Sequence, residues 1–379
     1  MLRLSIKPHW FLQTANASQA LSRLIELLRA IEEEHSIAGA ASRLGVSYRY
    51  AWGLIRRASH EFGAPVLDMT RGRRATLSKL GEKLVAADRR IKARIAPLLD
   101  SLASELEAEI ERSRSGAAPV LTIHASHGYA IELLRDFLGR RNLPVDLKYR
   151  GSMEALASLA GGSCDLAGFH VPLGELQHAV LGYYVKWLDP QRQILINLAT
   201  RRQGIMVAPR NPKSIQSLAD LAQPGVRFVN RQFGSGTRIL LDLLLRGEGL
   251  DSARIAGYDT GEFTHSAVAS CIASGLADAG FGVEQGARSF GLDFVPIVSE
   301  RYFLVCGEEF LTSLPVRRIR EVLASKQFRA EAGKFAGIDV TQAGTTLAIG
   351  EAFPDLPPLP GAEREAADAG ALLPRPLTR

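Results

Sequence analysis

Apolar residues in the first third of the chain recur at three- and four-residue spacing, which is typical of amphipathic helices. One such stretch covers residues 18 to 34. A longer one covers residues 78 to 112, and Pro97 inside it is expected to kink or divide the helix. Its apolar stripe is longer than a small neighbouring domain needs. The long helix is therefore expected to pair with a second copy of the chain, or to pack on the next domain of its own chain.

Beyond residue 119 the pattern changes to short apolar runs that alternate with helical ones. Strands are expected at VLTIHAS, VDLKYRGS, CDLAGFHV, ILINLATRRQGIMVAP, VRFVNRQ, ADAGFGV and DFVPIVSERYFLVC. Such a βαβ rhythm predicts an α/β fold with parallel sheets covered on both faces. About 200 residues of it favour two lobes around a cleft over one sheet.

Residues 36 to 63 predict two helices joined by a tight turn. Gly45 occupies the turn, since glycine tolerates the left-handed backbone that ends a helix. Ser47 is placed to cap the second helix, whose inward face is small and apolar. The outward faces carry the predicted DNA-reading residues Ser47, Tyr48, Arg49, Tyr50 and Arg56. This arrangement fits a helix-turn-helix in a major groove, and the alternative is an ordinary helix pair with a solvated basic face.

A basic hairpin is expected directly after that helix pair, over residues 65 to 78. Two short extended runs flank Gly72, and the predicted DNA-contacting residues around this tip are Arg71, Arg73 and Arg74. Guanidinium groups in such a wing meet phosphates or enter a minor groove. A wing immediately after a helix-turn-helix is much more specific than either feature alone.

The charge of the chain is concentrated in the same region. The whole chain is +6, whereas residues 42 to 94 hold thirteen basic and four acidic residues, a net +9, which leaves −3 for the rest. A local excess of this kind is the electrostatic signature of a nucleic-acid-binding face. A generally basic protein would not concentrate its charge in this way.

Composition excludes several other classes of protein. The chain contains no apolar run long enough for a membrane span, and its start lacks the pattern of a signal peptide. Its three cysteines, Cys164, Cys271 and Cys306, are few and widely spaced, which favours reduced buried thiols. We therefore expect a cytoplasmic protein without a membrane partner.

The segment from Asn230 to Arg238 carries the most informative chemistry of the second half. A strand ends there, a Gly-Ser-Gly-Thr turn follows, and a helix begins. Free backbone N–H groups and the positive end of a helix dipole favour an anion at such a turn. The segment lacks the P-loop pattern of nucleotide-binding proteins.

Other predicted helix starts carry similar hydroxyl or imidazole groups. The candidate ligand-binding residues are Ser126, His127, Ser152, His170, Arg231, Ser235, Gly236, Thr237, Thr264, His265 and Tyr302. If these groups converge, they form a site for a small oxyanion between the lobes. The alternative for each hydroxyl taken alone is a helix N-cap. His124 and His127 lack the partners of a zinc site, and no GxSxG motif supports a hydrolase.

Two known families share these features. Residues 18 to about 112 resemble the LysR-like winged helix of ModE-type molybdate-responsive regulators, chiefly through SIAGAASRLGVSYRYAWGLI. Residues 119 to about 310 resemble a periplasmic-binding-protein-like domain through NPKSIQSLADLAQPGVRFVNRQFGSGTR, THSAVASCIASGLADAGFG and LDFVPIVSERYFLV. The chain departs from the ModE pattern because it lacks the small oxyanion-binding C-terminal modules.

The resemblance implies specific ligands. Tungstate- and molybdate-binding relatives surround a tetrahedral oxyanion with hydroxyls and main-chain N–H groups. The arginine before the SGT turn of the tungstate-binding branch is matched here by Arg231, and its threonine by Thr237. Ser126, Ser152 and Thr264 are similar in position to the hydroxyl ligands.

The sequence as a whole predicts an α/β protein that regulates transcription and is not an enzyme. Its expected parts are a winged helix-turn-helix (1–77), a long dimerisation helix (78–112), a two-lobed type II periplasmic-binding-protein-like domain (113–340) and a partly disordered tail (341–379). Expected partners are operator DNA, an effector that is molybdate or tungstate, and a second copy of the chain, with a tetramer as the larger alternative. No covalent cofactor and no metal ligand is expected. The alternatives are the same architecture sensing a pterin or a small carboxylate such as formate, an enzyme built on the two-lobed half, and a DNA binder without a ligand.

Overall fold

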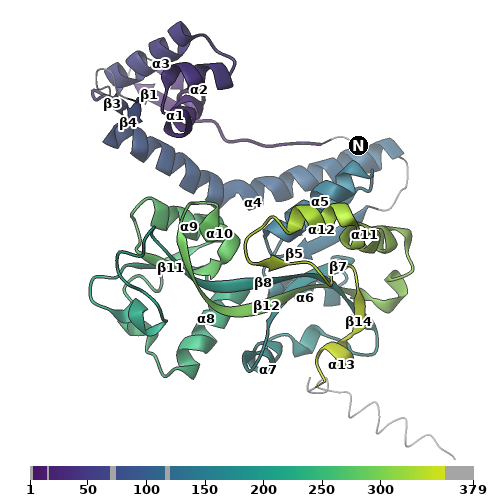
Figure 1. Ribbon diagram of the computed structural model, residues 1–379. Helices are drawn as coiled ribbons and strands as arrows, with labels where there is room; N and C mark the ends of the chain where they lie inside the picture. Colours follow the sequence, from purple (N-terminus) through teal and green to yellow (C-terminus); the bar gives the residue numbers. More distant parts are fainter. Residues whose placement is uncertain (1–2, 15–16, 69–73, 116–119, 355–379) are drawn as a thin grey trace, which may run out of the picture.

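The computed structural model describes residues 3–14, 17–68, 74–115 and 120–354, and comprises a small N-terminal domain, one long helix and a two-lobed α/β domain (Figure 1). The long helix lies across the top of both lobes and carries the N-terminal domain at one end. This arrangement confirms the α/β class and the order of parts expected from the sequence.

The N-terminal domain is a helix-turn-helix followed by a short hairpin. Its elements are α1 (Ser22–Glu34), α2 (Ile37–Arg43), α3 (Tyr48–Glu61), β3 (Leu67–Asp68) and β4 (Thr76–Leu77). Gly45 has a φ of 66°, as the turn between α2 and α3 requires. Serine hydroxyls cap both helices: Ser36 Oγ accepts from Gly39 N and Ser47 Oγ accepts from Tyr50 N, each at 3.2 Å.

The first helix begins later than expected, and the sequence pattern missed a hairpin before it. Strand β1 (Phe11–Thr14) pairs with β2 (Ala17–Ala20) in an antiparallel ladder, so α1 begins only at Ser22. The segment before the hairpin, residues 3–10, runs back along the long helix. There Leu4 N donates to Glu107 Oε1 at 2.7 Å, which ties the chain start to the far end of that helix.

Helix α4 (Lys79–Ser115) is continuous over 37 residues. Pro97 therefore does not divide it, although the helix changes direction near its middle (Figure 1). Leu98, Leu102 and Leu106 are exposed on this helix at four-residue spacing. They form one unpaired apolar stripe, which we call the α4 leucine stripe.

The two lobes share one hydrogen-bonded sheet of order β10-β9-β11-β8-β12-β7-β5-β6. Its strands are β5 (Leu121–Ala125), β6 (Val145–Tyr149), β7 (Leu166–Pro172), β8 (Gln193–Val207), β9 (Phe228–Arg231), β10 (Gly261–Glu262), β11 (Ala279–Val283) and β12 (Asp293–Gly307). Pairing is parallel among β5, β6 and β7 and among β9, β10 and β11. The long strands β8 and β12 are antiparallel and cross between the lobes, so the expected parallel order holds only within each lobe.

Helices cover both faces of each lobe. Lobe 1 carries α5 (Tyr129–Arg140), α6 (Ser152–Ala160), α7 (Leu176–Leu181), α11 (Leu314–Ala324) and α12 (Lys326–Ala332). Lobe 2 carries α8 (Gly236–Gly247), α9 (His265–Ala273) and α10 (Glu284–Arg288). Each lobe has an apolar cluster on either side of the sheet. The three cysteines are buried and unpaired. Across the described ranges, no helix combines the length and hydropathy that a membrane span requires.

The expected tail starts later than residue 341. Strand β13 (Ile338–Asp339) and strand β14 (Thr346–Ala348) both pair with β8, and α13 (Ile349–Ala352) follows. Phe353 is buried in the apolar cluster of lobe 1 beside Ile349. This burial makes the segment part of the α/β domain, while residues 355–379 lie outside the described part of the chain.

Candidate functional site

Four helices of the α/β domain begin at one small cavity between the lobes. Lobe 1 contributes the starts of α5 and α6, and lobe 2 contributes the starts of α8 and α9. The cavity volume is about 30 Å³, which is enough for a few water molecules or one compact ion. Because each helix start carries a partial positive charge and free N–H groups, the cavity is suited to an anion.

The structure brings eight of the eleven predicted ligand-binding residues to the wall of this cavity. They are Ser126, His127, His170, Arg231, Ser235, Gly236, Thr237 and His265. The turn before α8 is held by Ser235, whose Oγ accepts from Arg238 N at 3.2 Å. Gly236 and Thr237 form the first turn of α8 and leave their N–H groups outside the helical ladder.

The other three predicted residues are buried but do not line the cavity. Ser152 starts α6, and its Oγ lies 3.4 Å from His170 Nδ1. The hydroxyl of Tyr302 donates to the Ser126 carbonyl at 2.8 Å, and its ring stacks on His170 with centroids 3.8 Å apart. Thr264 caps α9 and donates its hydroxyl to the Ala93 carbonyl of α4 at 2.9 Å. Ser152 and Tyr302 therefore position wall residues, and Thr264 serves a different contact.

Arg231 is a charged residue of the cavity wall without an ion-pair partner among the described residues. It ends strand β9, is 9 % exposed, and forms no ion pair with the described residues. Its Nε is buried without a hydrogen-bond partner. Burial, together with the neighbouring charge of Arg201, lowers the pKa of Arg231 to about 9, which still keeps the guanidinium charged near neutral pH. A buried cation without a partner favours an anionic ligand.

Arg201 also lines the cavity, and the sequence analysis missed it. It lies on β8 and pairs with Glu300, its register partner on β12, with both side chains buried. Two arginines between apolar runs of one strand, as in LATRRQGIMV, were the available signal. Because Glu300 neutralises Arg201, the net charge of this pair is zero and Arg231 remains the uncompensated cation.

Both buried histidines of the cavity are held neutral. Desolvation lowers the pKa of His170 and of His265 well below the usual range, and the charges of Arg201 and Arg231 lower it further. His265 Nδ1 accepts from Val283 N at 3.4 Å, so the proton of its neutral ring resides on Nε2. His170 Nε2 is buried without a partner. The described residues include no cluster of potential metal ligands.

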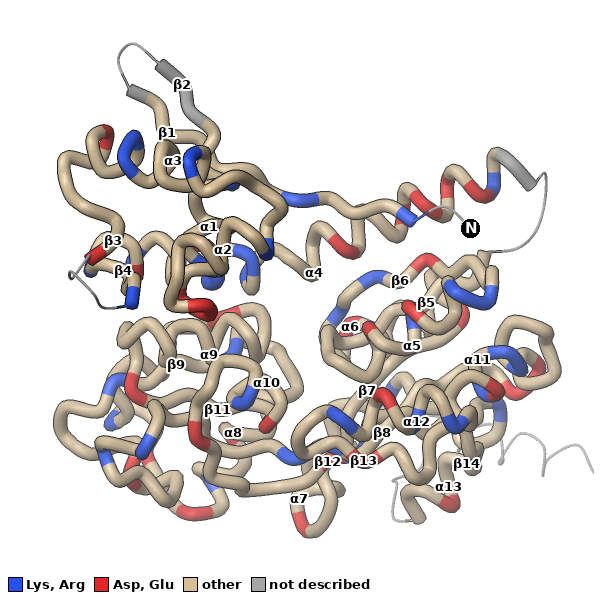
Figure 2. The backbone as a smooth tube through the Cα atoms, turned by 45° about the horizontal axis from the view of Figure 1, so that its top comes forward, with Lys and Arg blue, Asp and Glu red and all other residues tan. Residues whose placement is uncertain are grey.

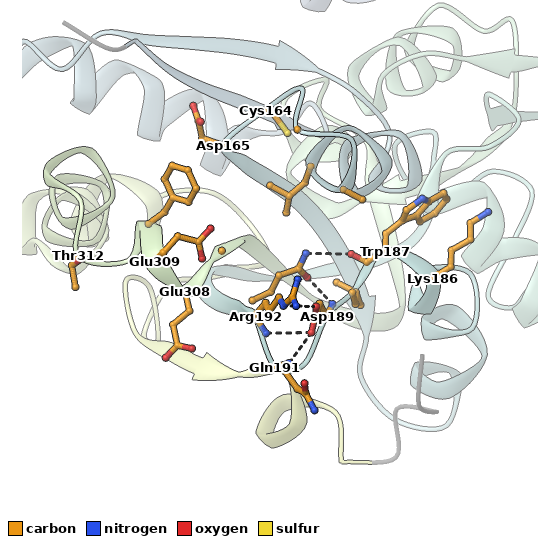
Figure 3. A pocket seen from close by; sticks show the side chains of 17 residues that line it. Cys164, Asp165, Lys186, Trp187, Asp189, Gln191, Arg192, Glu308, Glu309 and Thr312 are labelled. Carbon is orange, nitrogen blue, oxygen red and sulfur yellow. Dashed lines mark hydrogen bonds and ion pairs between the residues drawn. The ribbon is translucent and has the colours of Figure 1, made fainter. Parts of the chain in front are cut away.

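A larger cavity of about 920 Å³ lies elsewhere on lobe 1, beyond α6 and the end of β12 (Figure 3). Its charged lining is mainly acidic, with Asp165, Asp189, Glu308 and Glu309 against Lys186 and Arg192. Its polar groups already bond to each other, as Asp189 Oδ1 does with two backbone N–H groups. This cavity is therefore not suited to an anion.

Four of the five residues of the helix-turn-helix that are predicted to read DNA lie at the start of α3. Ser47, Tyr48, Arg49 and Tyr50 are exposed at its N-terminus, while Ala51, Leu54, Ile55 and Ala58 are buried behind them. Tyr48 and Tyr50 are about half exposed, so both rings are accessible to a partner. Arg56 is exposed farther along α3, and basic residues continue onto the first half of α4 (Figure 2).

The wing is described only in part. Strands β3 and β4 pair antiparallel, as expected for a hairpin. Arg74 precedes β4 and is exposed. Arg71 and Arg73 lie outside the described residues.

Comparison with protein families assigns both halves of the chain. Residues 22–82 match the family described as "Bacterial regulatory helix-turn-helix protein, lysR family". Residues 135–324, just over half of the chain, match the family described as "PBP superfamily domain". The two matches fall on the helix-turn-helix with its wing and on the two-lobed domain.

Three curated relatives share parts of the chain. "Uncharacterized protein YvgK" of Bacillus subtilis is 32% identical over 203 residues, which is 53% of this chain and 64% of that protein. A Clostridium pasteurianum protein, "Uncharacterized protein in ferredoxin 2Fe-2S gene 5'region", is 36% identical over 107 residues, 28% of this chain and 95% of that protein. "Molybdenum-pterin-binding protein MopB" of Rhodobacter capsulatus is 37% identical over 98 residues, 24% of this chain and 36% of that protein.

Among solved structures, full-length BenM overlaps 83% of this chain and 98% of its own, with 17% identity and a TM-score of 0.40. CbnR, a LysR family transcriptional regulator, overlaps 79% of this chain and 98% of its own, with 20% identity and a TM-score of 0.35. Scores this low support no conclusion about function or domain arrangement. The family matches support a conclusion about membership: the chain belongs to the PBP superfamily and carries a helix-turn-helix of the lysR family of bacterial regulatory proteins.

Proposed function

We propose that this regulator binds operator DNA through its winged helix and senses a small tetrahedral oxyanion, molybdate or tungstate, in the cavity between its lobes. The observation that carries the proposal is Arg231, a buried guanidinium without an ion-pair partner among the described residues, at the meeting point of four helix starts. Genes for molybdenum or tungsten enzymes, or for their transport, are the corresponding targets.

Three further features support an oxyanion. The hydroxyls of Ser126, Ser235 and Thr237 and the N–H groups of α8 are hydrogen-bond donors without an acidic neighbour in the cavity wall. A volume of about 30 Å³ suits a compact ion better than a fused-ring molecule. A relative that matches 24% of this chain, MopB, is named as a molybdenum-pterin-binding protein.

A larger organic anion is the second candidate. A neighbouring cavity of about 580 Å³ shares Tyr149, Arg150, Gly151, Gln232 and Phe263 with the small one. A pterin could place an anionic group beside Arg231 and its rings in this outer space. A small carboxylate such as formate could occupy the inner cavity alone.

The regulator is proposed to act as a homodimer. The α4 leucine stripe supports this, because Leu98, Leu102 and Leu106 are 61%, 46% and 43% exposed on one long helix. Paired recognition helices would then meet paired half-sites on DNA.

Isothermal titration of the full chain with tungstate, molybdate and sulfate tests the effector. Tight binding of tungstate or molybdate with weak or absent sulfate binding supports the oxyanion sensor. Selective binding of a pterin or of formate, with neither metal oxyanion bound, replaces it by the second candidate.

A further inference from the structure

Helix α4 is attached to both outer edges of the shared sheet. At the β6 edge, Ser101 Oγ accepts from Tyr149 N at 3.0 Å and Ser104 Oγ accepts from Leu147 N at 2.8 Å. At the β10 edge, Arg94 Nε donates to Glu262 Oε2 at 2.7 Å. Strands β6 and β10 are the two ends of the sheet, so one helix bridges lobe 1 and lobe 2.

Pro97 lies between these two attachments and opens a gap in the helix. Proline has no N–H, so residue 97 cannot donate to the carbonyl four residues earlier, which belongs to Ala93. Thr264 Oγ1 fills the gap, because it donates to the Ala93 carbonyl at 2.9 Å. The same oxygen accepts from Ala267 N at 2.9 Å and thereby caps α9.

The residues from 262 to 265 alternate between the helix and the cavity. Glu262 and Thr264 contact α4. Phe263 and His265 line the small cavity. Phe263 also lines the larger outer space, together with Pro97 and Leu98 of α4. One short segment therefore lines the candidate cavity and contacts the bend of the long helix.

We infer that residues 262–265 transmit the state of the cavity to α4, and that the bend at Pro97 is where the DNA-binding domain is reoriented. This inference rests on the proposed function. An anion held by groups from both lobes favours one lobe spacing over others, and only such a difference in affinity can shift the conformation. Since α4 is fixed to both lobes, a change in their spacing is absorbed between Arg94 and Ser101. The helix lacks one backbone hydrogen bond there, so bending costs least at that point.

Thr264 is thus a coupling residue and not a ligand. Loss of the Thr264 hydroxyl is expected to separate anion binding from the response of α4, which a purely structural role would keep together. The anion still binds, because the cavity wall is intact, but its binding no longer changes α4. Because coupling is reciprocal, a change in α4 then no longer alters the anion affinity of the cavity either.

Amide hydrogen exchange of the full chain, with and without tungstate, tests this inference. The variants are Thr264→Val, which removes the hydroxyl, and Pro97→Ala, which restores an N–H to the helix. Thr264→Ser keeps the hydroxyl and is expected to behave as the wild type. Ser313 caps α11, because its Oγ accepts from Val316 N. Ser313→Ala therefore controls for the loss of a helix cap away from α4.

Without ligand, Thr264→Val is expected to speed exchange around residues 93–101 and at the start of α9 by about fivefold relative to Ser313→Ala, the effect of one lost hydrogen bond. When tungstate is added to the wild type, amide exchange around Pro97 is expected to change. Thr264→Val and Pro97→Ala are expected to bind tungstate with affinities within about threefold of the wild type. In these two variants, exchange around Pro97 should no longer respond to tungstate.

An unchanged exchange rate in ligand-free Thr264→Val overturns the inference, as does a full α4 response in both variants. Failure of tungstate and molybdate to bind in the titration overturns the proposed effector instead. In that case the ligand-free comparison alone decides the coupling through Thr264.

Discussion

Arg201 and Glu300 face each other across the two long strands that join the lobes, and their side chains form a buried ion pair. The pair lies where β8 and β12 cross from one lobe to the other. Glu300 neutralises Arg201, one of the two buried arginines of the cavity, whereas Arg231, the other one, forms no ion pair with the described residues. The charge of the cavity wall thus depends on a contact between residues 99 positions apart in the sequence.

Removing the carboxylate of this pair is expected to destabilise the α/β domain. Glu300→Gln leaves Arg201 buried without its anion, which costs about 3–5 kcal/mol of unfolding free energy. Chemical denaturation measures the loss. Glu321→Gln, which removes an exposed partner of Arg318, is the matched control and should change stability by less than about 1 kcal/mol. Equal effects of the two substitutions would contradict the role given to the buried pair.

The unpaired arginine is expected to contribute most of the anion affinity. Arg231→Ala removes charge-assisted hydrogen bonds, so the Kd for tungstate or molybdate should rise about 10- to 100-fold. Titration calorimetry measures it. Arg227→Ala, at an exposed ion pair with Asp278 just before the same strand, should leave the Kd unchanged. An unchanged Kd in Arg231→Ala would remove Arg231 from the site.

The two buried histidines are expected to give stability a pH dependence on the acid side. Their folded-state pKa values lie well below the usual value near 6.5, so the unfolded chain binds more protons below about pH 6.5. The free energy of unfolding should therefore fall as pH drops below 6.5, by up to about 1.4 kcal/mol per pH unit for each histidine, and should not depend on them above it.

Denaturation of His170→Gln and His265→Gln across pH 5 to 8 checks this dependence. Each variant should show a shallower acid slope than the wild type, whatever its absolute stability. His60→Gln, at an exposed position, should keep the wild-type slope. A wild-type slope in both cavity variants would mean that these histidines titrate normally.

The recognition helix can be tested once an operator has been selected from random DNA by the full chain. Arg49→Ala is expected to weaken operator binding by about 1–3 kcal/mol, or about 5- to 150-fold, if the guanidinium reads a base. Anion affinity should not change, because Arg49 lies in the N-terminal domain. Arg318→Ala on α11 removes an exposed arginine from the α/β domain and serves as the control. Undiminished operator binding would remove Arg49 from the reading face.

The α4 leucine stripe is expected to hold two chains together. Leu102→Glu places a charge in the middle of the stripe and should shift the chain from dimer to monomer in sedimentation equilibrium. Leu276→Glu changes a leucine that is 55% exposed on lobe 2 and should leave the dimer intact. A Leu102→Glu dimer of wild-type stability would assign the stripe another role.

The sequence by itself determined the local elements of both halves. Gly45, Ser36 and Ser47 define the helix-turn-helix because a turn and two caps depend only on neighbouring residues. The turn from Ser235 to Thr237 could likewise be predicted from its own residues to be the start of a helix, as the structure shows, and it remains a candidate for anion binding. Eight of the eleven predicted ligand-binding residues reach one cavity because helix starts at the ends of strands share an edge of a sheet.

The tertiary structure alone decided which of these groups face the cavity and which contact α4. Thr264 reads as a ligand in sequence, yet its hydroxyl bonds to Ala93, because Pro97 leaves that carbonyl open 171 residues away. The pairing of Arg201 with Glu300 depends on the register of two long strands. Such contacts join residues remote in the chain, and no local pattern of apolar and polar positions records their distance.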